Sequence, residues 1–370
     1  MERRKKRILI NGRFSSHHFA IRNVIFNITK HLSLDGGYDV YVVLNKDSEI
    51  EEFKSLDVRI VTNPCKADSA AMNHLYTMFV FPFILMKYKI DLVIYPQICI
   101  YLFNPCRSIL YMHDLIEYYV DSQNWKKMLF RKLAYPYVCK LADGIVAVSE
   151  NTKKDIISIL KVRPDKVYVN YDGADDRLAP VSDTVARAYV EKKFGIDRYV
   201  FYIGYLTHPQ KNLIYLIDEF ERFHTTHSDY SLVFAGPKGK RAEQILTRAA
   251  RLGSNFHYLG KVDYEDLQYL YSACEVFCFP SLYEGFGMPV LEAMACGAPV
   301  ITSNRSSLPE ILPDAEWLID PEKTYDLSVR LSDIVGCSRT EISKKNIDYA
   351  KNFSWRKHGE RLKTIIKQYI

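Results

Sequence analysis

The chain has 370 residues, of which 48% are hydrophobic and 25% are charged, an ordinary globular composition with enough apolar residues for two cores. The net charge of +6 is mild, and much of the excess lies in the basic run Arg3 to Arg7, which no apolar segment of signal-peptide length follows. Eight cysteines are scattered without paired metal-ligand spacing, so we expect reduced thiols in a cytoplasmic protein and no zinc site.

Short strand-like runs alternate with helical patterns through the first half, which is typical of parallel sheets covered by helices. The expected strands are RILI, DVYVVL, VRIV, DLVIYP, SILYMHD and GIVAVS, and IRNVIFNITKHL is an expected helix. Ser69 to Met86 carries no formal charge and approaches the length of a membrane span. Because Asn73, His74 and Pro82 interrupt it and lysines end it, we expect a core helix instead of a span.

Basic and apolar residues interleave in NWKKMLFRKLAYPYVCK, Asn124 to Lys140. One interpretation is an interfacial helix that docks weakly on an anionic inner membrane leaflet. The other is a core helix with a solvated basic face. In the interfacial interpretation, one face of the helix carries the apolar residues Trp125, Met128, Leu129, Leu133 and Tyr137, and this face is bordered by Lys126, Lys127, Arg131 and Lys132. No nucleic-acid-binding module is recognisable, so we expect no nucleic-acid partner.

The alternation lapses between Tyr168 and Asp197, in YVNYDGADDRLAPVSDT, and restarts with the strand YVFYIG. We therefore predict a boundary near residue 183, with domains 1–183 and 184–352 and a final helix, 353–370, that could return to the first domain. YSLVFAG, NFHYLG, VFCFPS and APVITS are further expected strands. The predicted fold class is α/β, with two doubly wound sheets facing across a cleft, and ligands of such sheets bind at the carboxyl ends of the strands.

The loop LYEGFGM joins the strand CEVFCFPS to the helix PVLEAMACG. Gly285 and Gly287 permit close approach of a ligand, and the helix N-terminus offers N–H groups to an anion. Glu284 lies beside this predicted anion site, and Glu292 lies about one turn inside the helix that follows. A carboxylate beside a phosphate is electrostatically unfavourable unless it accepts hydrogen bonds from hydroxyl groups. Because sugars supply many hydroxyl groups, the pattern suggests a sugar attached to a phosphate. The alternative is a solvated loop glutamate and a glutamate favoured by the helix dipole.

The stretch YIGYLTHPQKN, Tyr202 to Asn212, is predicted to form the other half of the phosphate site. Its strand ends at Gly204, and Lys211 opens a helix from which its ammonium group can reach a diphosphate. His208 could add positive charge, although an ordinary surface-loop histidine is the simpler account.

The stretch from Glu284 to Glu292, EGFGMPVLE, followed by GAPVITSNRSSLPE, resembles family 4 of the retaining glycosyltransferases, which have the GT-B fold, and within it the mannosyl- and rhamnosyltransferase subset. The resemblance implies that Glu284 and the backbone of the next residues hold the donor hexose. It also implies that Glu292 holds the donor ribose. The implied donor-binding residues are Gly204, Gly285, Phe286, Gly287, Met288 and Glu292, with Lys261 and Val262 of NFHYLGKVDYEDL at the nucleobase.

Some positions depart from the family pattern. The family usually has an arginine beside the lysine, but Gln210 precedes Lys211 here and Tyr205 occupies the position of another arginine. A family histidine that contacts the donor sugar matches His113, whose alternative role is to satisfy a backbone carbonyl. In the first loop Ala20 and Asn23 stand at the equivalents of a glycine-rich turn, with Gly12 nearby.

No Asp-x-Asp motif occurs, so we expect a reaction without metal or cofactor, with Glu284, His113 and Lys211 as the catalytic residues. The resemblance implies front-face transfer of a hexose with retention, from a nucleotide-diphosphate sugar to a carbohydrate or lipid-linked oligosaccharide acceptor in surface-polysaccharide assembly. The expected location is cytoplasmic, with peripheral binding to the inner face of the plasma membrane. The alternative is a non-catalytic sugar-nucleotide-binding or scaffold subunit with the same fold.

Overall fold

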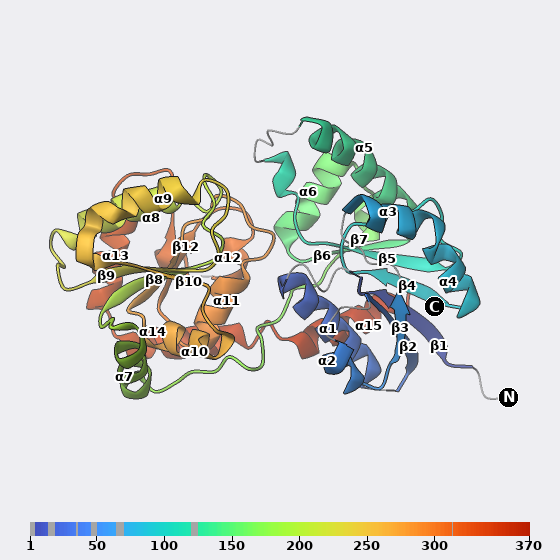
Figure 1. The fold of residues 1–370 in the computed structure, drawn as a ribbon, viewed down its shortest axis with the longest axis horizontal. Helices are drawn as coiled ribbons and strands as arrows, with labels where there is room; N and C mark the ends of the chain where they lie inside the picture. The colour runs from blue at the N-terminus through green and yellow to red at the C-terminus, as the bar shows by residue number, and fades with distance from the viewer. Residues whose placement is uncertain are drawn as a thin grey trace. The chain divides into compact units, whose positions relative to one another are not determined.

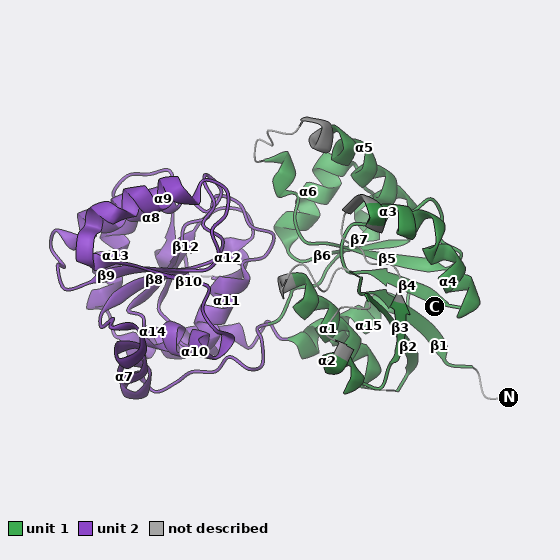
Figure 2. Ribbon diagram, viewed as in Figure 1, with its two compact units in different colours: residues 1–173, 355–370 green, residues 174–354 purple. Residues whose placement is uncertain are grey.

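The computed structural model describes residues 4–13, 19–34, 36–45, 50–63, 70–119, 125–312 and 314–370. The chain forms two compact units, residues 1–173 with 355–370 and residues 174–354 (Figure 2). Each unit has one parallel sheet with helices on both faces (Figure 1), so the doubly wound prediction is confirmed for each half. Within the described ranges no helix is long and apolar enough to cross a membrane.

The sheet of unit 1 has the strand order β3-β2-β1-β4-β5-β6-β7. Its strands are β1 Lys6–Asn11, β2 Tyr38–Asn45, β3 Arg59–Asn63, β4 Leu92–Tyr95, β5 Arg107–Met112, β6 Gly144–Ala147 and β7 Val167–Val169. Its helices are α1 Phe19–Ser33, α2 Ile50–Lys54, α3 Ala70–Phe79, α4 Phe81–Lys87, α5 Trp125–Leu141, α6 Glu150–Leu160 and α15 Trp355–Ile366. The six expected strands all form, and β7 is a short additional strand at the edge.

The strands of unit 1 are buried on both faces, which explains their continuous apolar runs. Leu9 packs in a cluster with Phe81 and Val138, from helices α4 and α5. The neighbouring Ile8 and Ile10 point to the other face, where α1 and α15 supply the apolar cover. The final helix therefore completes the core of the first unit.

The apolar stretch from Ser69 to Met86 differs from the single core helix that we expected. It forms two short helices, and α4 begins next to Pro82, which lacks the N–H group that a continuous helix would need. Tyr76, Phe81 and Leu85 are buried, but Phe79 and Phe83 are 55% and 66% exposed. The prediction of a core helix was thus wrong for half of its apolar side chains.

Helix α5 also turns apolar residues to solvent. Leu129, Leu133 and Tyr137, three of the residues predicted for one apolar face, are exposed, while Ala134 and Val138 face the core. The side chains of residues 125–128, which include Trp125, Lys126, Lys127 and Met128, lie outside the described part of the chain. The exposed face is therefore apolar as well as basic, as the interfacial interpretation requires.

The sheet of unit 2 has the strand order β10-β9-β8-β11-β12-β13. Its strands are β8 Tyr199–Ile203, β9 Ser231–Ala235, β10 Phe256–Gly260, β11 Val276–Phe279, β12 Val300–Ser303 and β13 Leu318–Ile319. Its helices are α7 Asp183–Phe194, α8 Leu213–His224, α9 Ala242–Ala249, α10 Tyr264–Ala273, α11 Met288–Ala295, α12 Leu308–Ile311, α13 Asp326–Gly336 and α14 Arg339–Ala350. The five expected strands form, and the two-residue β13 was too short to recognise.

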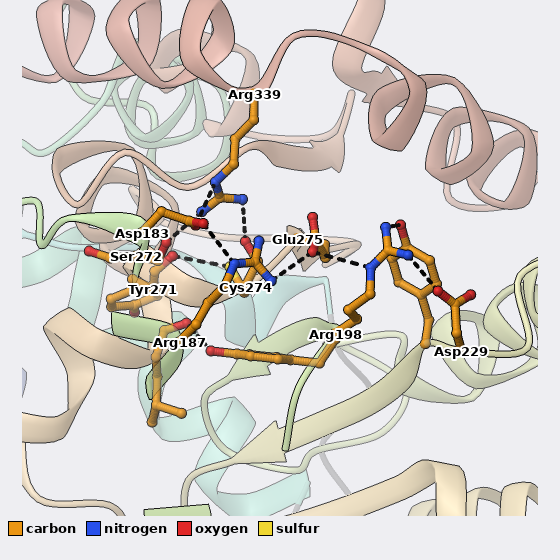
Figure 3. Close-up of polar contacts among 12 residues, drawn as sticks. Asp183, Arg187, Arg198, Asp229, Tyr271, Ser272, Cys274, Glu275 and Arg339 are labelled. Carbon is orange, nitrogen blue, oxygen red and sulfur yellow. Dashed lines mark hydrogen bonds and ion pairs between the residues drawn. The ribbon is translucent and has the colours of Figure 1, made fainter. Parts of the chain in front are cut away.

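The units divide at Gly173–Ala174, ten residues before the boundary that we placed near residue 183. An ionic network holds α7 to unit 2 (Figure 3), and a hydrogen bond holds the segment just before α7. Arg187 on α7 contacts Glu275 at 2.9 Å, and Arg339 on α14 lies 3.5 Å from Asp183. The N–H group of Val181 also donates to the hydroxyl of Ser272 at 3.0 Å. These contacts fix residues 181–187 to the second sheet, which a Gly- and Asp-rich sequence does not reveal.

Candidate functional site

The strand order of unit 2 reverses between β8 and β11, so the loops that follow these two strands diverge from one point at the carboxyl edge of the sheet. This is where open α/β sheets bind ligands. Gly204 follows β8, and the loop that contains Glu284 follows β11. The predicted site residues of unit 2 therefore share one edge of one sheet.

Lys211 and Glu284 meet at this point. The Nζ atom of Lys211 lies 2.6 Å from Oε1 of Glu284, and the two side chains are only 14% and 13% exposed. The Lys211 ammonium also lies 5.1 Å from the centre of the Phe279 ring. The helix α8 begins at Leu213, so Lys211 precedes the helix instead of opening it, a small correction to the prediction.

Gln210, which stands where the family usually has an arginine, joins the two loops. The side-chain amide of Gln210 donates to the main-chain carbonyl of Tyr283 at 3.2 Å, and the main-chain carbonyl of Gln210 accepts from the N–H group of Leu282 at 2.9 Å. The loop that carries Lys211 is thereby held against the loop that carries Glu284. Gln210 therefore positions the two loops relative to each other, but unlike an arginine it supplies no positive charge.

Two serines that the sequence analysis did not select position the backbone around Glu284. The hydroxyl of Ser306 accepts from the Glu284 N–H group at 3.1 Å and donates to the Glu284 carbonyl. The hydroxyl of Ser307 lies within donating distance of the carbonyls of Glu284 and Phe286, at 3.0 and 2.9 Å. The only sequence signal for this contact is the SNRSSLPE stretch, in which the serine positions have no visible link to Glu284.

Gly287 ends the loop and caps helix α11 with φ of +109°, a conformation that side chains rarely adopt. A Cβ atom there would lie 2.8 Å from the Leu308 side chain and 3.0 Å from that of Ile311. Met288 is the first residue of α11, Pro289 has no N–H group, and the Val290 N–H group donates to the Gly287 carbonyl at 2.9 Å, so the Met288 N–H group and the positive end of the helix dipole are what α11 offers at the end of this loop. Phe286 is buried and packs edge-on against Phe353, with ring centres 5.9 Å apart.

Glu292 lies one turn inside α11, as predicted, and is partly buried. The hydroxyl of Tyr271 donates to its Oε2 atom at 3.1 Å. Burial raises the pKa of Glu292 to about 7, with a smaller contribution from the negative charge of Asp175. The carboxyl group is thus costly to ionise in the ligand-free protein, and hydroxyl donors from a ligand would favour its charged form.

Three glycine-containing loops pack closely beside this site. Gly236 donates its N–H group to the Gly260 carbonyl at 2.7 Å, and a Cβ atom on Gly236 would lie 2.2 Å from the Gly204 carbonyl. Lys261 and Val262 follow Gly260, where Lys261 is exposed and Val262 is half-buried. The predicted nucleobase corner is therefore at the same sheet edge as Gly204.

His208 does not supply the missing positive charge. Burial and the nearby charge of Arg241 both lower its pKa, so the neutral form is favoured. The simpler account of His208 as an uncharged loop histidine is the one that its surroundings favour.

His113 follows β5 in unit 1, where its Nε2 atom lies 2.7 Å from the carbonyl oxygen of Pro96. Because a carbonyl oxygen only accepts, Nε2 must carry a proton, which leaves Nδ1 as the acceptor in a neutral ring. His113 thus makes the backbone contact that we considered as its structural role, and this contact also orients the ring.

The first loop is described only in part. Residues 14–18 and the side chain of Ala20 lie outside the described part of the chain. Asn23 lies within α1, where its side-chain oxygen accepts from Asn27 at 2.8 Å. Gly12 follows β1, and a Cβ atom there would approach the Val43 carbonyl to 2.9 Å. Gly12 is therefore explained by packing against β2.

Two family models match the chain, one over each unit. Residues 21–178 match the model described as glycosyltransferase family 4, and residues 189–353 match glycosyl transferases group 1. The O-antigen chain mannosyltransferase B of Escherichia coli is 35% identical over 224 residues, which are 57% of this chain and 57% of that protein. The serotype-specific mannosyltransferase WbdA of Escherichia coli is 29% identical over 235 residues, which are 60% of this chain and 28% of that protein.

These alignments span a little over half of the first relative and just over a quarter of the second. Among solved structures, HepE from Anabaena in complex with UDP and glucose superposes with a TM-score of 0.72. That comparison covers 98% of this chain and all of the other at 18% identity, and a likeness at this identity concerns the fold. The α/β GT-B fold expected from the sequence is confirmed, and each half of the chain matches a glycosyltransferase family model, with sequence similarity to the mannosyltransferases named above.

Proposed function

We propose that this chain is a retaining glycosyltransferase that moves a mannose- or rhamnose-like hexose from a nucleotide-diphosphate sugar to a carbohydrate acceptor. The acceptor is lipid-linked, and the reaction belongs to surface-polysaccharide assembly on the cytoplasmic side of a membrane. The mannosyltransferase names of the similar proteins support the sugar class. The observation that carries the proposal is the contact of Lys211 with Glu284 beside the N-terminus of α11.

This arrangement suits a sugar joined to a diphosphate. The Lys211 ammonium and the positive end of the α11 dipole can neutralise the leaving diphosphate, which supports a reaction without metal or cofactor. When the donor binds, its phosphates compete with Glu284 for Lys211, and sugar hydroxyls replace the ammonium as donors to Glu284. The ion pair in the ligand-free protein thus keeps both charges satisfied until the donor arrives.

In the proposed reaction the bond from the anomeric carbon to the phosphate oxygen breaks while a bond to the acceptor oxygen forms on the same face. The acceptor proton passes to the departing phosphate oxygen. Glu284 and the Nδ1 atom of His113 act as acceptors that orient the sugar, and neither is a nucleophile. Glu292 accepts the ribose hydroxyls and Lys261 and Val262 line the nucleobase site.

Calorimetric titration with GDP, UDP, dTDP and ADP tests the donor site. We expect one nucleotide to bind selectively and the Lys211→Ala variant to bind it at least about tenfold more weakly, because a charge-assisted contact to phosphate is lost. The matched control is Lys344→Ala, which removes an exposed lysine from α14. Equal binding by the Lys211→Ala variant and the unchanged protein would contradict the phosphate role.

A transfer assay with the matching activated mannose and rhamnose tests catalysis. Glu284→Ala should lower the rate at least about tenfold, while Glu341→Ala on α14 should not change it. Nucleotide binding without turnover of any activated sugar would instead favour the binding-subunit alternative.

A further inference from the structure

Exposed apolar side chains are concentrated on one part of unit 1. Of the nineteen large apolar side chains that are exposed among the described residues, fourteen lie between Met72 and Leu141, and four lie on unit 2. Phe83 and Leu133 are the most exposed of the fourteen, at 66% and 68%. Scattered exposure of single residues is ordinary, but concentration on neighbouring elements indicates a contact surface.

The elements that carry these side chains are in contact. The ring of His74 on α3 lies 6.1 Å from that of Phe130 on α5, and its Nδ1 atom accepts from the Ile100 N–H group at 3.4 Å. The hydroxyl of Tyr137 on α5 donates to the Leu102 carbonyl at 3.4 Å. Helices α3, α4 and α5 cover the same face of the sheet (Figure 1). We call the exposed side chains of α3, α4, α5 and the segment 102–103 the α3–α5 surface.

The charge of the α3–α5 surface has a single sign. Residues 70–90, 92–113 and 125–142 contain no aspartate or glutamate, and their exposed lysines include Lys87, Lys132 and Lys140. Glu117, the carboxylate next to α5, is paired with Arg131 and accepts from the Tyr135 hydroxyl at 3.2 Å. Asp143 is paired with Arg107 at 2.7 Å. Glu117 and Asp143 are therefore neutralised, as is Asp91, which is paired with Arg4 at 3.0 Å, while Asp114 accepts from the Ile116 N–H group at 3.0 Å.

Phenylalanines and leucines bordered by lysines fit the interface of an anionic bilayer, where the rings enter the headgroup region and the ammonium groups meet lipid phosphates. Protein interfaces are in contrast depleted of lysine at their centres. We propose that the α3–α5 surface docks this protein on a membrane that contains anionic phospholipid. The inference rests on the proposed function in one respect: a lipid-linked acceptor lies in the membrane, so docking there would bring the protein to its acceptor.

The test is co-sedimentation of the full chain, without donor or acceptor, with vesicles of phosphatidylcholine alone or with about one third phosphatidylglycerol. We expect binding to the anionic vesicles only, and weaker binding as salt rises from about 0.05 to 0.5 M. The double variant Phe83→Ser/Leu133→Ser should bind about tenfold more weakly, because two inserted side chains are lost. Lys87→Glu/Lys132→Glu should lose at least as much.

Matched controls on unit 2 replace other exposed side chains: Val185→Ser/Val329→Ser, 55% and 53% exposed, for the apolar pair and Lys192→Glu/Lys344→Glu for the basic pair. Both controls should bind vesicles like the unchanged protein. Circular dichroism and nucleotide titration show whether each variant is folded, and keep the result separate from failure of the proposed donor site.

Two results would overturn the proposal. One is vesicle binding that is absent, or that both α3–α5 variants retain in full. The other is an unchanged protein that sediments as a dimer and does not bind vesicles, together with a Phe83→Ser/Leu133→Ser variant that sediments as a monomer. That result would assign the surface to a second copy of the chain.

Discussion

Replacement of Glu292 by glutamine should stabilise the ligand-free protein in a pH-dependent way. Burial raises the pKa of Glu292 from an ordinary value of 4.5 to about 7, so the folded state binds a proton that the unfolded state releases between these values. Stability from this group is complete below pH 4.5 and is lost as the pH rises through 7. The difference in pKa corresponds to about 3 kcal/mol, which we reduce to about 2 kcal/mol because Glu292 keeps some contact with solvent.

Glutamine has no charge to bury, and its carbonyl oxygen can still accept from the Tyr271 hydroxyl. We therefore expect the variant to be more stable by about 2 kcal/mol near pH 8 and equally stable near pH 4.5. Urea unfolding at the two pH values measures this, and hydrogen exchange of the α11 amides locates it in unit 2. A variant that is equally or less stable near pH 8 would refute a costly ionised Glu292.

Three further changes test other contacts. Gly287→Ala forces an alanine to φ of +109° and 2.8 Å from Leu308, and should lower the free energy of unfolding by about 1–3 kcal/mol, as thermal unfolding measures. At a temperature at which this variant is folded, it should not bind nucleotide. Ser307→Ala removes the hydroxyl shared by two buried carbonyls, and should cost about 1–2 kcal/mol and lower kcat/KM for transfer. In an Asp172→Asn variant, acidification from pH 6.5 to 4 should destabilise unit 1, because burial lowers the pKa of His358 to about 4 and the unfolded state binds the proton first. The substitution is needed because burial raises the pKa of Asp172, 3.9 Å from His358, to about 6, which acts with the opposite sign. Hydrogen exchange of the α15 amides at the two pH values reports this, and a flat profile would contradict it.

The sequence predicted the repeated strands and the central site residues because both are local patterns. Buried parallel strands are continuous apolar runs, and EGFGMPVLE keeps a loop, a helix start and both glutamates within nine positions. Contacts between distant segments were not predictable in this way. Ser307 reaches Glu284 from 23 positions away, and Arg187 reaches Glu275 from 88 positions away. Composition alone also could not say which apolar residues of α4 and α5 face solvent, since that depends on how each helix is rotated on the sheet.

The return of α15 to the first unit determines the order in which the two units can be completed during synthesis. Residues 174–354 are contiguous, so unit 2 has its whole sequence as soon as Ser354 leaves the ribosome. Unit 1 must wait for Trp355, Leu362 and Ile366, which cover the Ile8 and Ile10 face of its sheet. The half of the protein that is translated first is therefore finished last, and until then α1 alone of these two helices covers this apolar sheet face, which leaves part of it open to chaperones and proteases.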